Sequence, residues 1–139
     1  MRLLLDTQAW LWWLMGSTRL PPAAREAIAD PANEPLISAV SIIEIAEKVR
    51  CGILTDMQPL TGDIEGAIAL DGFGRLPITT AHATRMAALG AAPEDLFDRI
   101  LVAQSLVEDI PLVSNDGRFD GLGVRRLWDR RDPPEPLRS

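Results

Sequence analysis

Short apolar runs alternate along this chain with longer segments whose apolar residues recur at helical spacing. The short runs, bounded by polar or turn-forming residues, are typical of buried strands, and the longer periodic segments are typical of amphipathic helices. Strands that alternate with helices through short connections predict a parallel sheet covered by helices. The expected strands are 2–5, 36–40, 76–79, 111–114 and 124–127, and the expected helices are 7–15, 21–29, 41–50, 61–70, 80–89 and 95–108.

Two of the apolar runs stop at an aspartate. Leu3–Leu5 ends at Asp6, and the run 111–115 ends at Asp116. In an open parallel sheet, ligands bind at the carboxyl ends of the strands, so both carboxylates are candidates for a binding site. For either aspartate taken singly, capping of the following helix or turn is the simpler interpretation. Only their combination with other acids favours a shared site.

Glu44 lies in a helix that is apolar on most of its circumference. The pattern Ser41-x-x-Glu44 fits a capping box, and Glu44 with Lys48 fits an ion pair at i,i+4 spacing. The surrounding residues 42–49 are nevertheless rich in isoleucine, alanine and valine. The Glu44 carboxylate is therefore expected on or beside a buried surface.

Asp98 is expected at the third position of a helix capped by Asp95, where the helix dipole favours an anion. The uninterrupted apolar run 100–103 predicts that this helix too is buried nearly all round. Carboxylates at buried surfaces are costly without a partner, and one shared cation would satisfy both Glu44 and Asp98. Carboxylate and water oxygens are the ligands that Mg²⁺ and Mn²⁺ prefer. The single histidine, His82, is expected in mid-helix as an ordinary surface or hydrogen-bonded residue without an evident catalytic partner.

The 139 residues, with 47% hydrophobic content, predict one domain over 1–130 and a mobile proline-rich tail over 131–139. Cys51 is the only cysteine, which excludes an internal disulfide. A net charge of -6 argues against purely electrostatic nucleic-acid binding without excluding a nucleic-acid substrate. The apolar runs are too short to span a bilayer, so we expect a soluble, cytoplasmic protein with no membrane partner.

Four segments of the sequence, taken together and in order, resemble the PIN-domain nucleases. More narrowly, they resemble the toxin component of VapBC-type bacterial toxin–antitoxin modules, and the resemblance runs from Met1 to about Trp128. It implies a Rossmann-like α/β/α sandwich with a mostly parallel five-stranded sheet. The segments that carry it are Leu3-Leu4-Leu5-Asp6-Thr7, residues 37–45, residues 95–104 and Leu112-Val113-Ser114-Asn115-Asp116.

The resemblance also implies a function and a set of site residues. It implies a metal-dependent endoribonuclease that uses Mg²⁺ or Mn²⁺, acts on RNA as a homodimer and pairs with a small antitoxin carrying a DNA-binding end. Carried over by position, the catalytic acids are Asp6, Glu44, Asp98 and Asp116. Asp6, Asp98 and Asp116 are the expected metal ligands, and Glu44 is expected nearby or linked through water. Thr7 and Ser114 match the family's supporting hydroxyl residues.

Other residues leave more than one interpretation open. Arg99 and Arg118 are candidate RNA contacts, but each equally fits a solvated surface charge or the partner of a nearby acid. Trp10, Trp12 and Trp13 point in more than one direction along a single helix. One or two of them are expected to pack under the sheet, and an interface role for the others is an equal alternative.

Two other functions compete with the nuclease interpretation. A haloacid-dehalogenase-like phosphatase needs Asp-x-Asp after the first strand, and Asp6-Thr7-Gln8 lacks the second acid. A PIN-like partner subunit of a DNA-binding regulatory complex, with little or no nuclease activity, is the stronger alternative. Retention of all four acids disfavours this alternative without excluding it.

Overall fold

Five parallel strands form the centre of the protein. The structure is a computed structural model that describes residues 1–54 and 62–129. The strands follow the order β3-β2-β1-β4-β5, and every neighbouring pair is parallel. The predicted α/β fold with a five-stranded sheet is thereby confirmed, and the sheet is wholly rather than mostly parallel. The strands are β1 (Arg2–Leu5), β2 (Glu34–Ser38), β3 (Gly74–Leu76), β4 (Leu112–Val113) and β5 (Arg126–Leu127).

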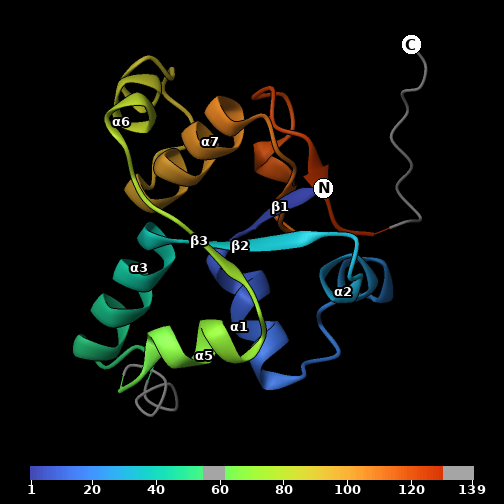
Figure 1. Ribbon diagram of the computed structural model, residues 1–139. Coiled ribbons are helices and arrows are strands. Elements are labelled where there is room, and N and C mark those ends of the chain that lie inside the picture. The colour runs from blue at the N-terminus through green and yellow to red at the C-terminus, as the bar shows by residue number, and fades with distance from the viewer. Residues whose placement is uncertain (55–61, 130–139) are drawn as a thin grey trace.

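Helices cover both faces of the sheet. Figure 1 shows α6 and α7 above the sheet, and α1, α2 and α5 below it. The short helix η1 (Gly117–Phe119) comes after β4. The other helices are α1 (Thr7–Met15), α2 (Pro22–Ala29), α3 (Ala39–Arg50), α5 (Ile64–Leu70), α6 (Thr80–Ala87) and α7 (Leu96–Glu108).

The alternation of side chains along β1 produces two cores. Leu3 and Leu5 pack with the fully buried Trp10 of α1, whereas Leu4 packs on the other face with Val102 of α7. All three leucines are completely buried, and burial of a leucine side chain stabilises a fold by about 1.5–3 kcal/mol. The first strand is therefore anchored on both faces, which fixes the position of Asp6 and Thr7 at its end.

The bounds of four strands differ from the expected ones: β2 and β3 begin and end earlier in the chain, and β4 and β5 are shorter. β2 ends at Ser38, because the Ser38 hydroxyl accepts a hydrogen bond from Val40 N–H and so starts α3 at Ala39. The proposed capping box at Ser41 is thus wrong, since Ser41 lies inside the helix. β3 ends at Leu76, before a proline that has no N–H to donate. The expected start of a helix at residue 61 and the expected tail at 131–139 lie outside the described residues.

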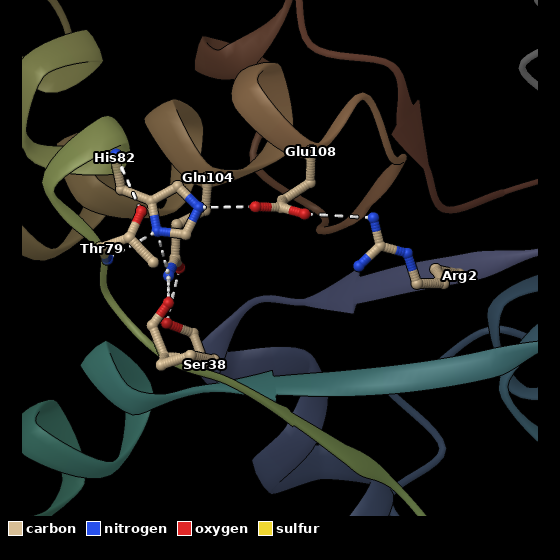
Figure 2. Close-up of polar contacts among 7 residues, drawn as sticks. Arg2, Ser38, Thr79, His82, Gln104 and Glu108 are labelled. Carbon is tan, nitrogen blue, oxygen red and sulfur yellow. Dashed lines mark hydrogen bonds and ion pairs between the residues drawn. The ribbon is translucent and has the colours of Figure 1, made fainter.

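His82 is a hydrogen-bonded residue, which is one of the two expected alternatives, but it lies in the first turn of α6 rather than in mid-helix. It is buried at the third position of α6, where its Nδ1 accepts a hydrogen bond from Thr79 N–H. A nitrogen that accepts carries no proton, so Nε2 carries it and donates to Glu108 at 2.9 Å. Arg2 binds the other oxygen of Glu108, and Figure 2 shows Glu108 between the two. His82 therefore has clear partners, and they join α6 to α7 and to the start of β1.

Gln104 of α7 extends this network to the end of β2. Its amide nitrogen lies 3.4 Å from His82 Nδ1, and its oxygen accepts a hydrogen bond from Ser38 Oγ at 2.6 Å (Figure 2). Both Ser38 and Gln104 are fully buried. The same serine thus starts α3 and ties it to α7, the two helices that carry Glu44 and Asp98.

The tryptophans of α1 divide as expected between core and partial exposure. Trp10 is fully buried, while Trp12 packs against Trp128 and Trp13 against Phe73. None of the helices in the described part of the chain is long and apolar enough to cross a membrane.

Candidate active site

Asp6 and Asp116 lie at the carboxyl ends of the adjacent parallel strands β1 and β4. The chain leaves β1 toward β2 on one side, and β4 lies on the other, so this is the point where the strand order reverses. Crevices at such points are where open α/β sheets bind ligands. Both aspartates also cap the next helix in the chain: Asp6 accepts from Ala9 N–H in α1, and Asp116 accepts from Arg118 N–H in η1. The capping and site interpretations are therefore compatible.

Ser114 connects these two aspartates. Its hydroxyl oxygen accepts a hydrogen bond from Asp116 N–H at 3.0 Å, and its hydroxyl hydrogen-bonds the Asp6 carboxylate. Ser114 is completely buried, so its single hydroxyl is held by these partners. The supporting role of Ser114 at the site stays a prediction.

Thr7 holds Glu44 in a comparable way. Thr7 Oγ1 lies 2.6 Å from Glu44 Oε1 and 2.9 Å from Ser41 Oγ. Because a carboxylate only accepts, the Thr7 hydroxyl donates to Glu44 and leaves its oxygen free to accept from Ser41. The other Glu44 oxygen, Oε2, lies 2.9 Å from Lys48 Nζ, which confirms the expected i,i+4 ion pair.

Asp98 enters the site from the first turn of α7. Asp95 caps this helix by accepting from Asp98 N–H, as the sequence predicts. The pKa of Asp98 is raised to about 6, chiefly by burial and also by the negative charges of Asp95, Glu44 and Asp116, while Arg118 opposes the rise. The carboxyl group of Asp98 is therefore influenced by acids from three other positions in the chain.

A pocket of about 360 Å³ brings the four predicted acids together. Asp6, Glu44, Asp98 and Asp116 all line it, although they come from four separate segments of the chain. Burial raises the pKa of Asp6 to about 6, with smaller contributions from the charges of Asp98 and Glu44, while Ser114 and Ala9 N–H oppose the rise. The remaining lining includes Thr7, Gln8, Trp12, Lys48, Leu101, Asn115, Arg118 and Phe119.

The two predicted RNA-contacting arginines lie in different environments. Arg118 lines the pocket and contacts both oxygens of Asp116, at 2.7 and 3.0 Å, and this hydrogen bonding holds the pKa of Asp116 below its usual range. Arg99 instead donates to the backbone carbonyls of Met86, Leu89 and Gly90, and to that of Pro93. Arg118 is thus placed at the site, whereas Arg99 closes the loop between α6 and α7.

Comparison with known proteins assigns the family. The family model described as the PIN domain matches residues 3–124. The chain belongs to the PIN domain family. No functionally curated protein matches it significantly.

Solved structures share this fold at low sequence identity. The crystal structure of VapBC2 from Rickettsia felis, bound to a DNA fragment from their promoter, matches with a TM-score of 0.67 and 17% identity, over 93% of this chain and 100% of that chain. A toxin–antitoxin complex from Klebsiella pneumoniae matches with a TM-score of 0.59 and 20% identity, over 86% and 92% of the two chains. The crystal structure of FitAcB from Neisseria gonorrhoeae matches with a TM-score of 0.58 and 17% identity, over 89% of this chain and 95% of that chain.

The donor set of this PIN domain suits a hard divalent cation. Four carboxylates border one pocket, and burial with mutual repulsion makes it costly to ionise Asp6 and Asp98 together without a nearby cation. Within residues 1–54 and 62–129, no three acidic, histidine or cysteine side chains are already close enough to enclose an ion. Glu44 and Asp116 are instead held by Lys48 and Arg118. Ion binding would therefore require side-chain movement at the pocket.

Sequence reasoning missed three residues of the site. Lys48 appeared only as the ion-pair partner of Glu44, and Ser41 only as a capping residue. Trp12 was considered for the core or an interface, but it lines the pocket. The spacing of Ser41, Glu44 and Lys48, at i, i+3 and i+7, places all three on one helical face and was the signal available in the sequence.

Proposed function

We propose that this PIN domain is a divalent-metal-dependent endoribonuclease that acts as the toxin of a toxin–antitoxin pair. The observation that carries the proposal is the convergence of Asp6, Glu44, Asp98 and Asp116 on one pocket at the carboxyl ends of β1 and β4. The metal would be Mg²⁺ or Mn²⁺, held by Asp6, Asp98 and Asp116, with Glu44 nearby or linked through water.

The chain's own residues would orient the reaction. The Thr7 hydroxyl binds one oxygen of Glu44. The Ser114 hydroxyl lies between the Asp6 carboxylate and the backbone N–H of Asp116 and hydrogen-bonds both. These hydroxyl groups would help to orient the carboxylates toward the substrate. A bound divalent cation would lower the pKa of an attacking water and stabilise charge on the phosphate oxygens. Arg118, beside Asp116, would contact an RNA phosphate. An RNA contact by Arg99 would require its guanidinium to leave the carbonyls that it binds.

Water is the proposed nucleophile because the cysteine and the histidine of this chain both lie away from the pocket. Cys51 is exposed at the end of α3, and His82 is buried against Glu108. Neither residue lines the pocket that holds the acids. Hydrolysis would then proceed in line at the phosphodiester without a covalent protein intermediate.

The proposed partner is a small antitoxin with a DNA-binding end, bound to a homodimer of this chain in the cytoplasm. In support of this proposal, the similar fold from Klebsiella pneumoniae comes from a toxin–antitoxin complex, and that from Rickettsia felis comes from VapBC2 bound to a DNA fragment from their promoter. An acidic pocket also suits insertion of a basic partner side chain, which would block both metal and substrate. The promoter DNA in the Rickettsia felis complex equally fits the alternative, a PIN-like regulatory subunit with little nuclease activity.

Cleavage of a defined single-stranded RNA by purified protein tests the proposal. We expect cleavage with Mn²⁺ or Mg²⁺, loss of cleavage in EDTA, and recovery when the metal is restored. Asp98→Asn should reduce cleavage by at least about 100-fold, since it removes a metal ligand. Asp95→Asn is the matched control: it removes the same charge three residues away, and asparagine still caps α7.

Two outcomes would contradict the proposal. Cleavage that continues undiminished in EDTA would refute the metal-dependent mechanism. Full activity of Asp98→Asn would refute the assignment of the acids. Absence of any cleavage by wild-type protein that binds Mn²⁺ would instead favour the regulatory-subunit alternative.

A further inference from the structure

Lys48 is a cation inside the pocket of acids. Its Nζ lies 2.9 Å from Glu44 Oε2, and it lines the same pocket as Asp6 and Asp98. The side chain of Glu44 is 13% exposed, whereas that of Lys48 is 41% exposed. The acid is therefore held within the protein, while the lysine has room to move toward solvent.

Both oxygens of Glu44 are already engaged. Its Oε1 accepts from Thr7, and its Oε2 is occupied by Lys48. A divalent ion at Glu44 would meet the ammonium group at short range, where repulsion between like charges is strong. A divalent ion held by Asp6, Asp98 and Asp116 beside Glu44 would therefore be repelled by the Lys48 ammonium group.

We propose that Lys48 is an exchangeable counter-ion of the pocket, which holds Glu44 in the metal-free protein and moves to a phosphate of the RNA substrate when a divalent cation binds. A lysine suits this exchange because its ammonium is a point charge on a flexible stem. Arg118 is held more firmly, since its planar group contacts both oxygens of Asp116. The proposal rests on the proposed function, because both the divalent cation and the RNA phosphate belong to it.

Mn²⁺ binding in the absence of RNA tests the competition. Titration followed by electron paramagnetic resonance should show Mn²⁺ binding roughly three- to tenfold tighter to Lys48→Gln than to wild type, because a competing charge is gone. Lys48→Arg keeps the competing charge, so it should bind Mn²⁺ no more tightly than wild type. The matched control is Arg50→Gln, which removes one positive charge from the same helix at an exposed pair with Glu47 outside the pocket. Unchanged or weaker Mn²⁺ binding by Lys48→Gln would overturn the proposal.

RNA binding as a function of salt tests the transfer to phosphate. Each phosphate contact to single-stranded nucleic acid adds about 0.7 to the slope of log affinity against log salt. With Ca²⁺, under conditions where the RNA is first shown to stay intact, the slope for Lys48→Gln should be smaller by about 0.7 than for wild type. In EDTA the two slopes should agree. An equal difference in both conditions, or none in either, would refute the exchange.

The two tests separate this inference from the proposed function. If wild-type protein binds no Mn²⁺, the metal site itself fails. If wild-type protein binds Mn²⁺ and cleaves RNA but Lys48→Gln binds Mn²⁺ no more tightly, only the exchange fails. Circular dichroism of each variant confirms that the comparison is made between folded proteins.

Discussion

At the scale of the residue, the site is a set of charges held in place by hydroxyl groups. Thr7 and Ser114 each bind a carboxylate, and Lys48 and Arg118 each neutralise one. Asp6 is only 8% exposed and is the most deeply buried of the four acids, so its charge is the most costly to maintain. The electrostatic arrangement that suits a metal thus lowers the stability of the metal-free fold.

Stability of the metal-free protein should fall as the pH rises from about 4 to about 6. The pKa of both Asp6 and Asp98 is raised from 3.8 to about 6, so in this window the folded protein holds protons that the unfolded chain has released. For the buried Asp6, this difference corresponds to at most about 3 kcal/mol. Urea unfolding in EDTA at pH 5 and pH 7 measures the effect.

Asp6→Asn should make the free energy of unfolding depend less on pH. For the wild-type protein at pH 7, addition of Mn²⁺ should raise the free energy of unfolding again. Asp109→Asn, at a side chain that is 92% exposed, is the control and should leave the dependence unchanged. Asp116 and Asp120 have lowered pKa values, so they stabilise the fold, and this contribution is lost only below this window. Stability that rises between pH 5 and pH 7 in EDTA would contradict the assigned repulsion.

Neutralising Asp98 should separate stability from metal binding. Asp98→Asn removes one of several mutually repelling carboxylates, so the metal-free variant should be as stable as wild type or more so. The same change should weaken Mn²⁺ binding, because a ligand is lost. Thermal unfolding with and without Mn²⁺ measures both effects. A destabilised metal-free variant would show that Asp98 has a structural role instead.

At the scale of the element, β1, β4, α3 and α7 each bring one acid to the pocket. Their relative positions depend on polar contacts as well as on the apolar cores. Ser38 and Gln104 join α3 to α7, and His82 and Glu108 join α6 to α7. The His82 ring and Arg2 together hold the pKa of Glu108 below its usual range. These contacts position the helices that carry Glu44 and Asp98.

Replacing His82 should destabilise the protein as a whole. His82→Leu leaves the Thr79 N–H, the buried Gln104 amide and the Glu108 carboxylate without this partner, and we expect a loss of about 2–4 kcal/mol. Urea unfolding followed by tryptophan fluorescence measures it. Thr84→Ala, at an exposed position of the same helix, should change stability by less than about 0.5 kcal/mol. A similarly small change for His82→Leu would show that the network contributes little.

At the scale of the whole molecule, the acidic pocket and the exposed apolar residues are the surfaces available to partners. Met15, Ile43 and Leu70 are 49%, 52% and 88% exposed, whereas Trp10 is buried. Contiguous apolar patches are typical of sites that another protein covers, whereas single exposed apolar side chains are ordinary on a protein surface. A partner that anchored on them and inserted a basic side chain into the pocket would act as an inhibitor.

Expression of this chain alone should arrest growth, and co-expression of the protein encoded beside it should restore growth. The physical reason is that an unrestrained nuclease degrades cellular RNA until its pocket is blocked. Growth curves with soluble expression confirmed by gel measure the effect, and Asp98→Asn is the inactive control. If the wild-type chain is soluble and harmless, the toxin proposal fails and the regulatory-subunit alternative is favoured.

Local pattern was sufficient for the order and type of the elements. Apolar runs and helical periodicity depend on near neighbours, so each strand and helix could be placed to within a few residues. Capping depends on which side chain turns back to the backbone, and for this reason α3 begins at Ala39 rather than at Ser41. The four acids could be singled out because each comes after a strand or lies in a buried helix, and the resemblance to the PIN domain related them to one another.

Only the tertiary structure decided which side chains meet. Several contacts depend on how distant segments pack. His82 binds Glu108, Arg99 binds four backbone carbonyls, and Lys48 lines the pocket. Arg99 binds the backbone and Arg118 lines the pocket. The sequence does not distinguish these two environments, because they depend on the residues that packing brings around each arginine. The sequence by itself therefore determined the elements and the candidate acids, while packing decided their partners, their burial and their pKa values.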